Sequence, residues 1–144
     1  MCCSGGKPHK LACDHYIQGF YGSQGNGLDQ IGALCEDGNS TKMAASNVAR
    51  PYIETCDAGY VVTGFKTSTG WVKRQKGLAS FSFKCENTDS IKADDNSDYY
   101  WINSLFEDRE KTFQWHCPAY TAASVIKGRS DSIINSFGLN CRGI

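Results

Sequence analysis

The 144-residue chain lacks the features that mark several common classes of protein. It has no long apolar run, so no segment is expected to span a bilayer. No apolar segment follows Met1 either, which predicts a mature chain with a start methionine, or export by another route. Basic and acidic residues balance at 15 each. Without a basic excess, nucleic acid and anionic membranes are not expected partners.

Signatures of catalysis and metal binding are absent as well. No CxxC pair occurs, and the three histidines are scattered without evident partners, so the spacing of zinc ligands is missing. The acidic run at Asp94, Asp95 and Asp98 lacks the glycine and glutamate of a calcium loop. No serine-hydrolase elbow and no cysteine–histidine signature is present. We therefore expect no cofactor, no metal and no enzyme activity.

Cysteine, in contrast, is abundant. The eight cysteines are an even number in a short chain, which favours disulfides formed in an oxidising compartment. The tripeptide Asn39-Ser40-Thr41 is an N-glycosylation acceptor motif, and it agrees with passage through such a compartment. The sequence thus predicts a secreted, extracellular protein.

Three segments of the chain repeat one pattern. They are LDQIGALC (28–35), LASFSFKC (78–85) and INSFGLNC (134–141), each with an apolar residue first, a large apolar residue fourth and cysteine last. A period of two places the apolar residues and the cysteine of each copy on one side of a strand. These segments are therefore predicted to be half-buried strands. The residues on the apolar side are Ile31, Ala33 and Cys35, then Phe81, Phe83 and Cys85, then Phe137, Leu139 and Cys141.

The repeat extends upstream of these strands. Phe20, Phe65 and Ile126 precede the final cysteines by 15, 20 and 15 residues, so the second copy carries an insertion. A Gly/Ser-rich turn separates two apolar strands in each copy, which predicts three hairpins. We expect one all-β domain over residues 1–144, built of units of about 1–35, 36–85 and 86–141.

The connecting segments 36–55 and 86–116 are polar and rich in turn formers. Within the second of these, residues 92–101 are predicted to be a loop with an acidic tip that runs into a strand. Residues 104–113 are predicted to make one helical turn, with Ser104 as its cap.

The repeat also suggests how the cysteines pair. In the simplest scheme each unit closes on itself, whereas a cyclic scheme would link neighbouring units; eight cysteines allow roughly a hundred connectivities. Cys2 and Cys3 remain, and a bond between adjacent cysteines would be strained. The pairs of the simplest scheme are Cys13 with Cys35, Cys56 with Cys85, and Cys117 with Cys141.

Two family resemblances meet at these residues. GFYGSQGNGLDQIGALC (19–35) resembles the closing segment of jacalin-related lectins, with one residue missing from its loop. CDAGYVVTGFKTS (56–68) and QWHCPAYTAASVIKGRSD (114–131) are similar to the cysteine-ended repeats of the vitelline membrane outer layer protein I family. Both resemblances imply a β-prism of type I, with three antiparallel Greek-key sheets around a pseudo-threefold axis. The rival is a β-trefoil, whose usual Gln-x-Trp triplets are absent from the chain.

The resemblance to jacalin-related lectins implies a sugar site at Gly25, Asn26, Gly27, Leu28 and Asp29. Glycines let backbone N–H groups approach a ligand closely, and a fixed carboxylate accepts strong hydrogen bonds from vicinal sugar hydroxyls. The alternative is a hairpin turn in which the glycines supply positive φ and the aspartate caps N–H groups. The neighbouring side chain expected to contact the sugar is Tyr21.

The other two copies differ at the equivalent positions. Aligned on Phe20 and Ile126, Asp29 corresponds to Asn135 and Gly25 to Asp131, so Ser130, Asp131 and Asn135 form a second candidate site. The second copy places Ala79 there and has a polar loop at 71–76 in place of the glycines.

Together these features predict a secreted, disulfide-rich lectin that binds glycans or glycoproteins. Two alternatives remain open. One is a structural or defence protein of an extracellular coat, and the other is a glycan transferase of the same fold, which the outer layer protein resemblance implies.

Overall fold

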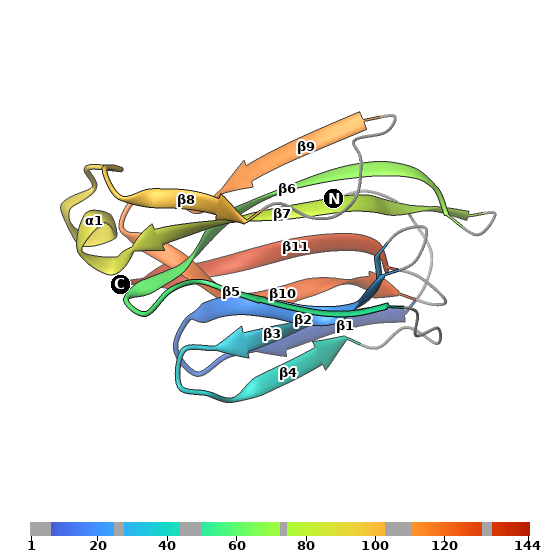
Figure 1. Cartoon of the computed structure of the whole chain (residues 1–144), viewed down its shortest axis with the longest axis horizontal. Helices are drawn as coiled ribbons and strands as arrows, with labels where there is room; N and C mark the ends of the chain where they lie inside the picture. The colour runs from blue at the N-terminus through green and yellow to red at the C-terminus, as the bar shows by residue number, and fades with distance from the viewer. Residues whose placement is uncertain (1–6, 25–27, 44–49, 73–74, 103–110, 131–133) are drawn as a thin grey trace.

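The structure, a computed structural model, describes residues 7–24, 28–43, 50–72, 75–102, 111–130 and 134–144 (Figure 1). These residues form three antiparallel sheets. The first sheet has the order β4-β3-β2-β5, with β2 at Ile17–Gln24, β3 at Leu28–Cys35, β4 at Ser40–Met43 and β5 at Arg50–Thr55.

The second sheet has the order β8-β7-β6-β9. Its strands are β6 (Tyr60–Val72), β7 (Gln75–Asn87), β8 (Tyr99–Ile102) and β9 (Lys111–His116), and the helix α1 (Thr88–Ala93) joins β7 to β8. The third sheet has the order β1-β10-β11, with β1 at Lys7–Ala12, β10 at Thr121–Ser130 and β11 at Ile134–Gly143. This architecture confirms the predicted β-prism I.

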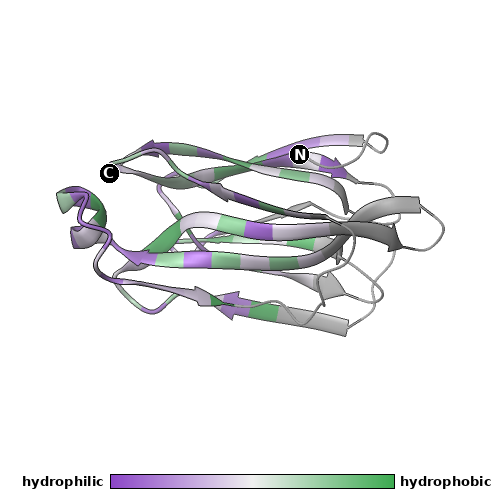
Figure 2. Ribbon diagram, turned by 90° about the horizontal axis from the view of Figure 1, so that it is seen from above, coloured by the Kyte–Doolittle hydropathy of each residue, from purple (hydrophilic) through white to green (hydrophobic). Residues whose placement is uncertain are grey.

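The three predicted hairpins form the centre of the prism. Phe20, Phe65 and Ile126 are fully buried and lie opposite Ala33, Phe83 and Leu139 on the partner strands. The ring of Phe20 contacts those of Phe81, Phe83 and Phe137 with centroids 5.1, 4.9 and 6.1 Å apart. Apolar and polar residues alternate along the strands in Figure 2, as the period of two requires. The apolar face predicted for each copy therefore does point into the core.

A bulge near the base of each hairpin links the three sheets. At each bulge one residue has no partner across the hairpin; these residues are Gln18, Thr63 and Ser124. The backbone carbonyl of each accepts a hydrogen bond from the N–H of a cysteine in another repeat unit. These bonds run from Cys56 to Gln18, from Cys117 to Thr63 and from Cys13 to Ser124, at 2.8, 2.7 and 2.8 Å. One contact repeated three times is the signature of the pseudo-threefold axis.

The three disulfides close each unit on itself, which agrees with the simplest pairing scheme. Their Cα–Cα distances are 5.5, 5.7 and 5.9 Å, within the range of unstrained bridges. Cys2 and Cys3 lie outside the described residues. The bridges are Cys13–Cys35, Cys56–Cys85 and Cys117–Cys141.

The segments predicted as connections contain more structure than expected. They supply the outer strands β4, β5, β8 and β9, of which β8 is the strand predicted to follow the acidic loop. The strand β5 pairs with β2 although it lies in the next repeat unit. The sheets therefore combine strands of neighbouring units. Lys92 and Ala93, predicted to open a loop, end the helix α1, which Asn87 caps at its start. Of the helical turn predicted at 104–113, residues 111–113 belong to β9 and the rest lie outside the described residues.

Among the described residues, no helix has the length and apolar character needed to cross a membrane.

Candidate functional site

The tips of the three hairpins lie at one end of the prism. The last paired residues are Gln24 with Leu28, Val72 with Gln75, and Ser130 with Ile134. The β6–β7 hairpin reaches furthest to the right in Figure 1, because residues 71–72 and 75–76 of the predicted loop continue the strands, with Trp71 opposite Lys76. The insertion thus lengthens the hairpin, and four of the six residues predicted as a polar loop are paired strand residues.

Asp29 sits at a bulge next to the first tip. The register passes from Ser23–Gln30 to Gln24–Leu28, so Asp29 has no partner across the ladder. The same irregularity leaves Ala79 unpaired in the second hairpin and Asn135 in the third. The predicted alignment of these three residues is therefore confirmed. The three positions are therefore equivalent in the backbone register of their hairpins.

The structure describes only some of the candidate residues at the hairpin tips. Gly25, Asn26, Gly27 and Asp131 lie outside the described residues. Of the remaining tip residues, Leu28 and Ser130 belong to the last backbone pairs of their hairpins, and Asp29 and Asn135 lie at the bulges next to those pairs.

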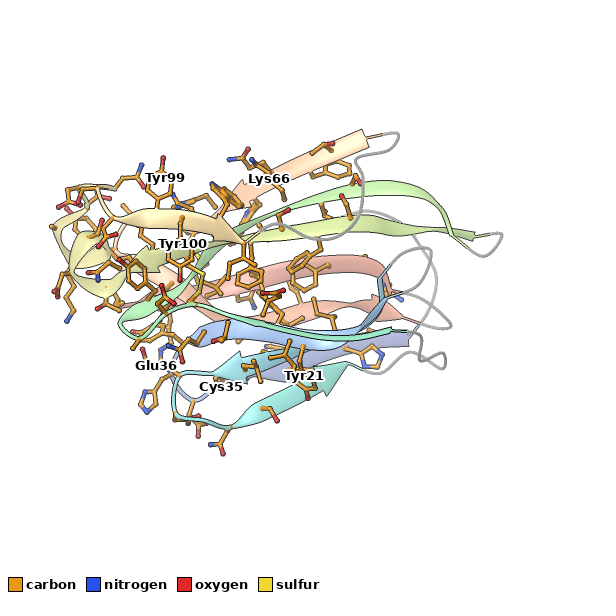
Figure 3. All side chains as sticks on the ribbon, viewed as in Figure 1. Tyr21, Cys35, Glu36, Lys66, Tyr99 and Tyr100 are labelled. Carbon is orange, nitrogen blue, oxygen red and sulfur yellow. A yellow bond between two sulfur atoms is a disulfide. The ribbon has the colours of Figure 1, made fainter. Side chains whose placement is uncertain are left out.

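Tyr21 lies further from the tip than the sequence analysis assumed. It stands in the middle of β2 on the outer face, between Gly32 of β3 and Ile53 of β5, and is partly exposed (Figure 3). Ile53 beside it is 71 % exposed. Gln24 lies three positions further along β2, which is about 10 Å along a strand. Tyr21 therefore lies on the outer face of the first sheet, set back from the end of β2.

A second polar cluster, which the sequence analysis missed, lies on the outer face of the second sheet. The side chains of Lys84 and Glu86 are each 7 % exposed, with Nζ and Oε1 3.7 Å apart. Lys84 Nζ also donates to Asn96 Oδ1 at 3.0 Å, and Glu86 Oε1 accepts from Thr63 Oγ1 at 3.1 Å. The ammonium group lies 4.2 Å from the centre of the Tyr99 ring.

His116 completes this cluster. Its Nδ1 lies 2.8 Å from the carbonyl oxygen of Cys117, so Nδ1 carries the hydrogen and Nε2 is free to accept from Lys84 Nζ at 3.1 Å. The expectation that the histidines lack partners is thus wrong for His116. Every charged group in the cluster has a partner within the protein, which is the arrangement of a structural clamp that holds β7, β9 and the 94–98 loop together.

The acidic loop after α1 is held by hydrogen bonds of its carboxylates. Asp95 Oδ1 accepts from the Ser97 and Ser90 hydroxyls and from the Ser97 N–H, and these bonds lower the pKa of Asp95. Asp98 accepts from the Tyr60 hydroxyl at 2.7 Å, and this bond raises the pKa of Tyr60. These hydrogen bonds hold the loop against α1 and β6.

Comparison with known proteins supports the fold. No family model matches the chain and no curated protein matches it. Among solved structures, it is similar to Calystegia sepium agglutinin, with a TM-score of 0.78 and 13% identity over 100% of this chain and 93% of that one. A mannose-specific jacalin-related lectin from Morus nigra, solved with mannose, gives 0.72 and 14% over 98% and 90%. A galactose-specific lectin from Artocarpus hirsuta, solved with methyl-α-D-galactose, gives 0.71 and 13% over 94% and 98%.

Proposed function

We propose that this protein is a secreted lectin that binds glycans at the tip of the β2–β3 hairpin, through Gly25, Asn26, Gly27, Leu28 and Asp29. One observation carries the proposal. Three bulges present residues 29, 79 and 135 in equivalent places, and the first combines a carboxylate with a glycine loop. A hairpin that only had to turn would not need a carboxylate at the bulge, since the second hairpin has Ala79 at the equivalent position.

The chemistry of the tip fits a neutral sugar. A carboxylate accepts hydrogen bonds from two vicinal hydroxyls, and charge strengthens these bonds roughly twofold over neutral ones. Glycines at 25 and 27 allow the sugar to approach backbone N–H groups closely. Tyr21 and the exposed Ile53 extend this site along the outer face of the first sheet for a second ring.

The third tip is a weaker second site in this proposal. It offers Ser130, Asp131 and Asn135, which have hydrogen-bonding oxygens but no glycines. The second tip, with Ala79 and no carboxylate, is not a site. The structural neighbours include lectins solved with mannose and with a galactoside, so both hexoses are the first probes to use.

A structural protein of an extracellular coat is the second candidate. The cysteine-ended repeats, closed by three disulfides, favour this candidate. In these repeats the chain resembles the vitelline membrane outer layer protein I family. On that account the tips are turns and bind no sugar. A glycan transferase is the third reading, but Asp29 and Asp131 lie in different hairpins, which does not provide the paired acid and base such chemistry needs.

A glycan array of the wild type and two variants tests the proposal. We expect the wild type to bind mannose- or galactose-containing glycans, and Asp29→Ala to lose this binding at an unchanged melting temperature. Asp14→Ala is the matched control, because Asp14 is an exposed aspartate that precedes β2, at the far end from the tip. Wild-type protein that binds no glycan would favour the coat protein. Binding that survives Asp29→Ala would refute the assignment of the site.

A further inference from the structure

Among the residues that the structure describes, the third sheet has three strands, whereas the other two have four each. In the first sheet β4 pairs with β3 through Ile31–Leu34, and in the second β8 pairs with β7 through Phe83–Glu86. In the repeat alignment the corresponding part of β11 is 137–142. Among the described residues, no strand pairs with β11 on that side. An unpaired antiparallel edge presents N–H and C=O groups that a further strand can bind.

A groove runs along this edge. It has a volume of about 880 Å³, and its lining includes β11 from Ser136 to Cys141, Phe65 and Trp115 of the second sheet, and Pro118. Cys141 is only partly buried, whereas the equivalent Cys35 and Cys85 are 4 % and 0 % exposed beneath their fourth strands. The groove therefore coincides with the position that β4 and β8 fill elsewhere.

At the corner between the first and second sheets, the fourth strand β8 also contacts the segment that joins these two sheets. There Tyr100 of β8 accepts a hydrogen bond at 2.7 Å from the N–H of Asp57, the residue after Cys56, and its ring packs against Tyr60 (Figure 3). The residue after Cys117 is Pro118, which lines the groove. Pro118 has no N–H to donate, so a strand in the groove would be held by the β11 edge and by apolar contacts.

The charge of the third sheet indicates the composition of that strand. The residues of β1, β10 and β11 include five basic and no acidic side chains, although the whole chain is neutral. Lys127, which lies opposite Gly138 and is exposed, lines the groove together with Arg129. Arg142 is exposed at the far end of β11. The basic members are Lys7, Lys10, Lys127, Arg129 and Arg142.

We propose that the β11 edge binds an extended segment of a partner protein, in which acidic side chains on the outer face alternate with apolar side chains that enter the groove. The segment adds antiparallel to β11 as the fourth strand of the third sheet. Its acidic side chains lie opposite Gly138 and Arg142, near Lys127 and Arg142, and its apolar side chains lie opposite Phe137, Leu139 and Cys141, toward Phe65 and Trp115. Main-chain hydrogen bonds give the affinity and the alternating side chains give the specificity.

The probe for this inference is the peptide Glu-Ile-Thr-Val-Glu-Val, acetylated and amidated, titrated into ¹⁵N-labelled full-length protein. We expect saturable binding with amide shift changes concentrated at 136–142, and new protection of these amides from hydrogen exchange. The same peptide with N-methyl groups on alternate residues should not bind, because it cannot donate to the edge. Lys127→Glu should weaken binding about fivefold, because an exposed ion pair with a glutamate of the peptide is replaced by repulsion between two carboxylates.

Lys92→Glu is the matched control, because Lys92 is an exposed lysine on α1 and should leave the binding unchanged. The inference is overturned if the peptide does not bind saturably, if shifts fall away from β11, or if the N-methylated peptide binds equally well. Amides of 136–142 that are already protected in the free monomer would show that the chain itself covers the edge. Protection that rises with protein concentration would assign the edge to a second copy, and it too would overturn the inference.

Discussion

The buried pair of Lys84 and Glu86 allows a quantitative prediction. Both side chains are 7 % exposed and their charged atoms are 3.7 Å apart. At an effective dielectric constant of about 20, this distance corresponds to an attraction of about 4 kcal/mol. Removal of one charge from such a pair leaves the other buried and costs about 3–5 kcal/mol. We therefore expect Lys84→Met and Glu86→Gln each to lower the free energy of unfolding by about 3 kcal/mol.

The double variant distinguishes a coupled pair from two independent contacts. Without either charge nothing is left uncompensated, and Thr63 can still donate to the amide oxygen of a glutamine. The double variant should therefore lose about as much as one single variant, a coupling energy of about 3 kcal/mol. Denaturant unfolding followed by tryptophan fluorescence, with the disulfides intact, measures all four proteins. Single variants that each cost under about 1 kcal/mol, or costs that add, would refute the clamp.

Three further predictions follow from the fold and the loops. Replacement of Cys117 and Cys141 by alanine opens a loop with a sequence separation of 24 and should lower the unfolding free energy by about 3.5 kcal/mol in a denaturant titration. Gly64→Ala should cost about 1–3 kcal/mol in the same assay, because its Cβ would lie 2.8 Å from the Trp115 carbonyl oxygen, whereas Gly143→Ala should be neutral, since nothing lies within 4 Å there. Asp95 has a lowered pKa, so its contribution is present above the unfolded pKa of about 3.9 and is lost as pH falls through the folded value. Protection factors for hydrogen exchange in the 90–98 loop, which correct for the pH dependence of the intrinsic exchange rate, should therefore fall below about pH 4 in the wild type but change little with pH in Asp95→Asn.

The central hairpins were predictable because their signal is local. Period-two alternation with a cysteine at the end of each copy located β3, β7 and β11, and the same alignment identified Asp29, Ala79 and Asn135 as equivalent. The cysteine spacing was enough to favour the observed disulfides. Each of these inferences compares residues close together in one copy with the same residues in another.

The outer strands and the clamp were not predictable in the same way. The strand β4 has four residues and α1 has six, too few for a clear pattern. The strand β8 is equally short, but the sequence did indicate a strand after the acidic loop. The clamp forms because Lys84 of β7 and His116 of β9 both lie opposite Gly64 of β6. Predicting it would require the register of three strands. Nothing in the local sequence of Lys84 marks it as buried, since its face of β7 reads as polar. Tyr21 was placed too near the tip because the length of β2 was not known.

The most direct test of sugar binding at the β2–β3 tip is an NMR titration of ¹⁵N-labelled protein with methyl α-mannoside and, separately, methyl α-galactoside. If the tip binds sugar, one of the two glycosides shifts the amides of residues 28–30 saturably, with smaller changes at 134–136 and none at 78–80. In Asp29→Asn, which keeps the shape of the side chain, the shifts at 28–30 should disappear while the rest of the spectrum is retained. Saturable shifts that persist in this variant, or that map away from the hairpin tips, would contradict the account.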